Sequence, residues 1–129
     1  MTNLDVSKTK VRNNPTEVKY TALTQLASGD KQFSASESRY GVQVVSDAND
    51  SRTVVLIKNS HTANVVVNVA PGNSPYNAEN PLTITVPASK EVAVSLESAL
   101  YKDLSIDGYV IYTTDTNFAK ISVACVTLP

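Results

Sequence analysis

Short runs in which apolar and polar residues alternate constrain the fold of this chain more than any other feature. In "PLTITVPA" the apolar residues Leu82, Ile84 and Val86 alternate with threonines, and "KEVAVSLES" repeats the pattern. A period of two is that of an extended strand, whose successive side chains point to opposite faces. Each run therefore predicts a strand with one apolar face, and that face needs a second layer to cover it.

Comparable β-type runs occur along most of the chain and are separated by turn-forming segments. The spacing of roughly 8–12 residues and the absence of an amphipathic helical pattern favour an all-β domain. We therefore expect a single antiparallel β-sandwich, jelly-roll-like or Ig-like, of about eight short strands. "SALYKDL" predicts one helical turn. The further runs are "TEVKYTAL", "RYGVQVVS", "RTVVLIKN", "ANVVVNVA", "SIDGYVIYT" and "FAKISVACVTL".

Three local features suggest how these strands connect. "SHT" lies between the nearly continuous apolar runs 52–59 and 63–70, which predicts a hairpin whose strands are buried on both faces. "TDTN" predicts a last hairpin in the same way. Gly41 interrupts the strand predicted at residues 39–46, "RYGVQVVS".

The domain organisation follows from length and from a change in composition. A chain of 129 residues has the usual size of one domain. Residues 1–15, "MTNLDVSKTKVRNNP", are polar and contain few apolar residues, so we predict a flexible N-terminal arm followed by a β-sandwich domain at 16–129. The arm either frays or orders against a neighbouring subunit.

Charge and the N-terminal sequence exclude several functional classes. The formal net charge of -1 provides no basic surface for nucleic acid or an anionic membrane. No apolar run approaches the roughly 20 residues of a spanning helix. The N-terminus has no apolar signal region, and the single cysteine excludes an internal disulfide, so we expect synthesis in the cytoplasm.

The residues that could perform catalysis are few. His61 is the only histidine and lies in a predicted turn, whereas Cys125 lies in an alternating strand and is expected to be a small buried hydrophobic residue. A nucleophile needs a base within hydrogen-bond reach, and these two positions do not predict such a pair. Asp103, Asp107 and Asp115 flank the last predicted hairpin, and we interpret them as solvated turn residues. We expect no enzyme.

The sequence predicts a metal or cofactor site no better than it predicts a catalytic site. Zinc requires clustered Cys and His ligands that the chain lacks. "SDANDS", with Asp47 and Asp50, and "APGNSPYNAEN", with Asn73, Asn77 and Glu79, supply oxygen ligands but lack calcium-loop spacing. Turn formation explains both segments, because Asp and Asn side chains hydrogen-bond their own backbone. We expect no cofactor and no metal.

The segment "APGNSPYNAENP", residues 70–81, breaks the strand pattern most strongly. Its prolines stiffen the backbone, so we predict a rigid crossover between two strands that leaves a polar surface free to bind a partner. Tyr76 is its only aromatic residue and could serve a sugar ligand or pack over the edge of its own sheet. The predicted interface residues are Asn73, Tyr76, Asn77 and Glu79.

Residues 52–129 resemble small β-sandwich virion proteins of tailed bacteriophages. The resemblance is carried by the pattern "VVLIKN", "VVVNVAPGN", "LTITVPASKEVAVSLES", "YKD" and the closing "GYVIYTTDTNFAKISVACVTLP". It implies a capsid decoration or auxiliary head protein that is made in the host cytoplasm and binds the major capsid protein at the virion surface. It also implies a homo-oligomer, a trimer or a dimer, that acts without catalysis.

Two other functions stay open from the sequence. A receptor-binding or glycan-binding module of a phage fibre or cell surface would use loop 70–81 and Tyr76. A tail-tube or head-completion protein would share the fold class and differ in the symmetry of its assembly.

Overall fold

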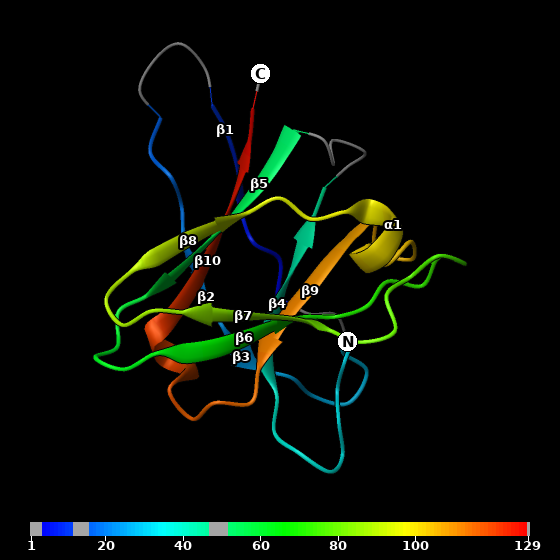
Figure 1. The fold of residues 1–129 in the computed structure, drawn as a ribbon, viewed down its shortest axis with the longest axis horizontal. Helices are drawn as coiled ribbons and strands as arrows, with labels where there is room; N and C mark the ends of the chain where they lie inside the picture. Colours follow the sequence, from blue (N-terminus) through cyan, green and yellow to red (C-terminus); the bar gives the residue numbers. More distant parts are fainter. Residues whose placement is uncertain (1–3, 12–15, 47–51, 129) are drawn as a thin grey trace.

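The computed structural model describes residues 4–11, 16–46 and 52–128, and these are nearly all β. Two five-stranded sheets account for the strands (Figure 1). Sheet A has the order β3 (Thr24–Gln25), β4 (Tyr40–Val45), β9 (Gly108–Thr113), β6 (Val65–Val69) and β7 (Leu82–Val86). Sheet B has the order β1 (Lys8–Lys10), β10 (Ile121–Thr127), β5 (Thr53–Asn59) and β8 (Glu91–Val94), and β2 (Thr21–Ala22) also pairs with β10.

The described residues include one α-helical turn, α1 (Ser98–Tyr101), and a 3-10 turn, η2 (Phe118–Lys120). The single turn α1 confirms the prediction for "SALYKDL". No helix in the described part of the chain is long and apolar enough to cross a membrane.

One hydrophobic core draws side chains from both sheets. Its fully buried members are mostly valine and isoleucine, which have few χ1 rotamers and pack well on pleated surfaces. The predicted faces are confirmed in β7, where Ile84 packs on this core while Thr83 and Thr85 are exposed. The largest fully buried residues are Val42, Val44, Val55, Ile57, Val65, Val67, Val69, Val86, Tyr109, Ile111, Ile121 and Val123.

Burial on both faces occurs in a different strand from those predicted. Lys58 of β5 is exposed and Val66 of β6 is 44% exposed, so these strands have one buried face each. Instead β9 is buried along its whole length. Val110 and Tyr112 on its outer face form a second apolar cluster with Leu26, because a segment distant in sequence covers this part of sheet A.

The two predicted hairpins are wrong. β5 lies in sheet B and β6 in sheet A, while β9 lies in sheet A and β10 in sheet B, so each short connection passes from one sheet to the other. β7 and β8 are separated in the same way. Alternation specifies that one face of a strand is buried, and a strand in either sheet satisfies that requirement.

Gly41 does not interrupt its strand. β4 runs without a break from Tyr40 to Val45 and pairs with β9. A Cβ atom at Gly41 would lie 2.6 Å from the carbonyl oxygen of Ile111, so the position requires glycine because the neighbouring backbone is close.

The described part of the N-terminal arm differs from the flexible segment that we predicted. β1 pairs in parallel with β10, with Lys8 opposite Cys125, and Val6 joins the core. The backbone N–H of Val6 donates to the carbonyl of Gln43 at 3.0 Å. Strand pairing uses backbone groups, so a segment with few apolar residues can be ordered by a free sheet edge. The described part of the arm thus pairs with a strand of its own chain. The β1–β10 pair is the one parallel strand pair among the described residues.

The side chain of Asn59 forms hydrogen bonds at two of the crossings, the connections in which the chain passes from one sheet to the other. Its side chain is 1% exposed, and its amide Nδ2 donates to the carbonyls of Ala63 at 3.0 Å and Val86 at 3.1 Å. Its Oδ1 accepts the backbone N–H of His61 at 2.8 Å. One buried amide thus forms hydrogen bonds with backbone groups of the β5–β6 connection and of the end of β7.

We expect Asn59→Ala to lower the free energy of unfolding by about 2–4 kcal/mol, because the hydrogen bonds of a buried amide would be lost. The matched control is Asn64→Ala. Asn64 is exposed and accepts one hydrogen bond, from the backbone N–H of Ala88 at 3.0 Å, so its loss should cost about 1 kcal/mol or less. Urea denaturation of both variants measures the difference. Equal losses would show that Asn59 does not link the crossings.

Candidate functional site

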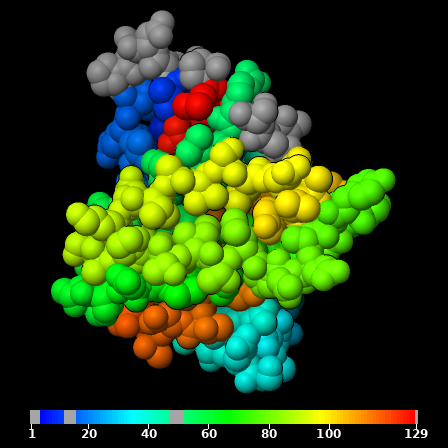
Figure 2. Space-filling model, in the orientation of Figure 1, coloured from blue at the N-terminus to red at the C-terminus, as the bar shows by residue number. Residues whose placement is uncertain are grey.

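Loop 70–81 joins β6 and β7, which are neighbours in sheet A. The predicted crossover is therefore wrong, and the segment is a long hairpin loop. It extends past the ends of both strands, beside α1 (Figure 1). In the space-filling view it projects from the body of the molecule on the right (Figure 2).

Hydrogen bonds to the segment around α1 hold this loop. The backbone N–H groups of Gly72 and Ala78 both donate to the carbonyl of Leu100, at 2.9 and 3.0 Å. The hydroxyl of Ser74 donates to the carbonyl of Ala99 at 2.7 Å. The carbonyls near the C-terminal end of a helix have no partner within it, and the loop supplies donors for them.

Gly72 sets the closest approach between the loop and this segment. A Cβ atom there would lie 2.4 Å from the carbonyl oxygen of Lys102 and 2.9 Å from its nitrogen. Any other side chain would push the two segments apart. The position of the loop thus depends on a glycine as well as on the prolines that the sequence emphasises.

The side chain of Asn73, a predicted interface residue, is hydrogen-bonded to other residues of its own chain. Its Nδ2 donates to Oδ1 of Asp103 at 3.1 Å, and its Oδ1 accepts the backbone N–H of Leu104 at 2.8 Å. Its backbone N–H donates to the carbonyl of Lys102 at 3.3 Å. Both polar atoms of the side chain therefore fix the loop to residues 102–104.

Asp103 is the charged residue at this contact. Desolvation by burial acts to raise its pKa, but hydrogen bonds from Ser105 and the nearby charge of Lys31 outweigh it, and the pKa lies below the ordinary value. Lys31 Nζ is 3.6 Å from Asp103 Oδ2. Asp103 is thus a carboxylate at neutral pH and accepts hydrogen bonds from two segments. We predicted a solvated turn residue, but it is partly buried and structural.

The other predicted interface residues lie on the free side of the loop. Tyr76 is 80% exposed, and Asn77 and Glu79 are also exposed. Leu104, which the sequence analysis did not select, is 61% exposed and is bonded to the loop through Asn73. We call residues 73–79 together with Leu104 the loop surface. Leu104 can be identified as part of this surface only from the tertiary contact between residues 73 and 104.

His61 and Cys125 lie far apart. The residue beside His61, Ser60, donates its backbone N–H to Lys120, directly before β10, whereas Cys125 pairs with Val55 further along that strand. The four steps of strand from Ile121 to Cys125 span about 13 Å, which is beyond hydrogen-bond reach. Cys125 is fully buried, as predicted, and burial raises the pKa of its thiol.

Within residues 4–11, 16–46 and 52–128, no group of three or more His, Cys, Asp or Glu side chains could hold a metal ion. The predicted alternative at "SDANDS", with Asp47 and Asp50, lies outside the described residues. In the loop, Asn73 uses its oxygen for Leu104, which leaves Asn77 and Glu79 as oxygen donors there.

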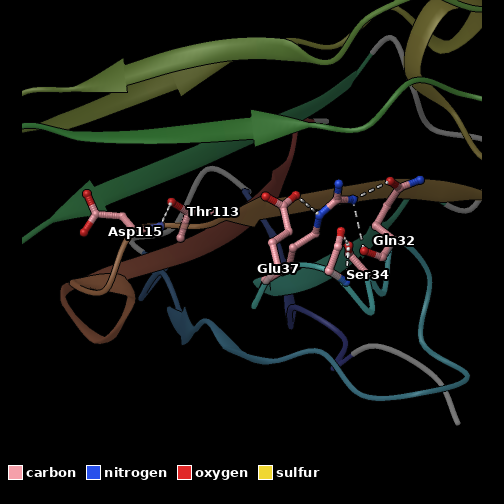
Figure 3. Close-up of polar contacts among 7 residues, drawn as sticks. Gln32, Ser34, Glu37, Thr113 and Asp115 are labelled. Atoms are coloured by element: carbon pink, nitrogen blue, oxygen red, sulfur yellow. Dashed lines mark hydrogen bonds and ion pairs between the residues drawn. The ribbon is translucent and has the colours of Figure 1, made fainter.

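A shallow pocket of about 260 Å³ lies at the connection from β3 to β4, which we call the pocket segment, and is lined by Gln25, Leu26 and residues 33–38. Figure 3 shows the polar contacts that shape this segment. Arg39 Nε donates to Glu37 Oε1 at 2.8 Å, and Arg39 Nη1 donates to the carbonyl of Gln32 at 3.1 Å. The guanidinium also lies 4.7 Å from the ring centre of Tyr112. Arg39 and Glu37 thus pair with each other within the segment, which suits a structural cover.

A third polar cluster lies on sheet B. The hydroxyl of Tyr20 donates to Glu91 Oε2 at 2.6 Å, and the ammonium of Lys58 lies 5.3 Å from the centre of its ring. The hydrogen bond to Glu91, with desolvation and the charge of that carboxylate, raises the pKa of Tyr20 to about 12. The phenol is therefore neutral at physiological pH and fastens the segment before β2 to β8.

We expect Asp103→Asn to destabilise the chain by about 1 kcal/mol at pH 7. The folded pKa of Asp103 is below the ordinary value of 3.8, so its contribution is complete well above pH 3.8 and is lost as pH falls through the folded pKa. The difference from wild type should therefore shrink below pH 3.8. Urea denaturation at pH 7 and pH 3 measures it.

Asp115→Asn is the matched control for this experiment. Asp115 accepts the backbone N–H of Asn117 at 2.7 Å, in the turn between β9 and β10. Amide hydrogen exchange should report faster opening of Gly72 and Ala78 in Asp103→Asn and no change there in Asp115→Asn. Identical exchange at these two amides in all three proteins would contradict the role of Asp103.

No protein-family model, curated protein or solved structure matches this chain.

Proposed function

We propose that this chain is a non-enzymatic structural virion protein that binds the outside of an assembled bacteriophage capsid, as a decoration or auxiliary head protein. Its partner is then the major capsid protein of the shell, and the chain is made in the host cytoplasm before it joins the virion. The observation that carries the proposal is the loop surface, where a loop held by the fold presents Tyr76 with 80% of its surface exposed.

Under this proposal the two sheets form a β-sandwich of jelly-roll type. The strand order supports it: β4, β9, β6 and β7 are neighbours in one sheet, β5 and β8 in the other, and successive strands repeatedly change sheet. Double-sheet jelly rolls occur in viral capsid proteins. This support is an analogy of fold, and the functional argument depends on the loop surface.

The way the loop is held suits binding to a large partner. Association costs less when the contacting groups are already fixed, and Ser74 and Asn73 fix the base of the loop through Ala99 and Asp103. A tyrosine has an apolar ring and a polar hydroxyl, which suits a contact area that is partly wet. Leu104 adds apolar area at 61% exposure.

The symmetry of a shell strengthens such a contact. A capsid repeats the same site many times, so a small oligomer of this chain can engage more than one site at once. Modest contacts per copy then give firm attachment. This mechanism needs no catalytic group, which agrees with the separation of His61 from Cys125.

Tyr76→Ala tests the proposal on capsid shells from the phage whose genome encodes the chain, prepared without this protein. We expect the wild-type chain to sediment with the shells at micromolar concentration and Tyr76→Ala to bind roughly tenfold or more weakly, because interface aromatics often contribute about 2 kcal/mol. Phe33→Ala is the control, since Phe33 is 43% exposed but belongs to the pocket segment. Its binding should equal that of wild type.

The same proteins distinguish the alternatives. If the wild-type chain fails to sediment with shells, or if Phe33→Ala weakens binding as much as Tyr76→Ala, the proposal is wrong. Retention of the wild-type chain on a glycan array, lost in Tyr76→Ala and without shell binding, would instead support a receptor-binding or glycan-binding module. Assembly into tubes would support the tail alternative.

A further inference from the structure

β7 lies at the edge of sheet A and has a free side. It pairs with β6 and has no second neighbour among the described strands. In the space-filling view the segment of residues 81–97 faces the viewer, uncovered by other described parts of the chain (Figure 2). A free strand edge presents N–H and C=O groups that can pair with another strand.

The hydrogen bonds of β6 show which groups of β7 point to this free side. The backbone N–H of Ala70 donates to the carbonyl of Val110 at 2.9 Å, and the carbonyl of Val66 accepts a hydrogen bond from the hydroxyl of Thr113 at 2.7 Å. Both partners belong to β9. Backbone groups of successive residues in a strand point to opposite sides, so the backbone groups of Val67 point away from β9, to β7.

Val67 lies opposite Ile84, so these two residues form a hydrogen-bonded pair of the β6–β7 ladder. The backbone groups of Thr83 and Thr85 therefore point to the free edge. Two donors and two acceptors are available there, spaced as in any antiparallel strand.

β7 also lacks the charges that usually prevent edges from pairing. Its sequence, "LTITV", contains no ionisable side chain. The other edges differ: β8 carries Glu91, β1 carries Lys8 and Lys10, and β3 has only two residues. Lysine on an edge strand opposes pairing with another chain, and β7 has no such protection in the described structure.

We infer that β7 pairs with β7 of a second copy of this chain, antiparallel, about a two-fold axis at Ile84. In this register Thr83 lies opposite Thr85 of the second copy, and each of the two such pairs exchanges two backbone hydrogen bonds. Ile84 lies opposite Ile84 of the second copy. Pro81 then lies opposite Pro87 of the second copy and ends the ladder on both sides, because proline has no N–H.

The side chains suit this register. Threonine pairs on adjacent strands stabilise a sheet, and here they lie on the outer face, beside Val66 at 44% exposure. The two Ile84 side chains form a non-hydrogen-bonded pair, in which side chains approach most closely, and each already packs on its own core. A second copy supplies hydrogen-bond partners to the free edge of β7 with two-fold symmetry. No charged side chain then lies opposite another. This inference is independent of the proposed shell binding.

Sedimentation velocity over a range of concentrations, with amide hydrogen exchange, tests the inference. We expect the wild-type chain to form a dimer. The Thr83 and Thr85 amides should exchange more slowly as the fraction of dimer rises with protein concentration. The amide of Ile84 should be protected at every concentration, because it bonds to β6. It serves as an internal control within the same strand.

Thr85→Pro removes an outward donor but no hydrogen bond to β6, and we expect a dimer dissociation constant that is roughly tenfold higher or more. The double variant Thr83→Lys, Thr85→Lys places lysines opposite each other and should be monomeric with an unchanged circular dichroism spectrum. Thr85→Val keeps the backbone N–H and should remain dimeric. A wild-type monomer at about 100 µM, or a dimer that persists in the double lysine variant, overturns the inference.

Discussion

The shared core between two sheets is the constraint on which the rest of this structure depends. Strands β4 to β10 each supply apolar side chains to it, and most of the fully buried residues are valine or isoleucine. Because consecutive strands mostly lie in different sheets, the chain must pass repeatedly from one sheet to the other at the edge of the core. The backbone at each crossing needs hydrogen-bond partners, and Asn59 supplies several of them from within β5. Close backbone approaches add a second demand: a Cβ atom at Gly108 would lie 2.1 Å from the carbonyl oxygen of Val44.

The loop surface is a consequence of the same arrangement. β6 and β7 are consecutive and stay in one sheet, so their long connection can extend past the sheet instead of crossing it. The segment that supports this loop, residues 97–107, is the crossing from β8 to β9. Leu100 and Asp103 therefore reach the loop because the chain changes sheet next to it. The proposed contact with a shell and the inferred pairing of β7 use two different exposed features of the same hairpin, its loop and its outer edge.

Sequence reasoning succeeded where the signal is local and failed where it depends on distant contacts. The strands at β4 to β10, the faces of β7 and the burial of Cys125 were predicted, because a period of two is a property of the backbone itself. Of the residues chosen in the loop, Tyr76 is exposed as an interface residue needs, whereas Asn73 is occupied by Asp103 and Leu104. Leu104 itself could not be chosen, since its neighbour in space lies about thirty residues away in sequence.

By itself the sequence determined an all-β chain, the positions of strands β4 to β10, turns of Asx and proline type, and one short helical turn. The tertiary structure alone decided that β5 and β6, like β9 and β10, belong to different sheets, that β9 is covered on both faces, and that residues 8–10 pair with β10. The physical reason is that alternation states which side of a strand is apolar but not which strand lies beside it. That choice is made by hydrogen bonds and packing between residues far apart in the chain, and spacing along the sequence carries no record of them.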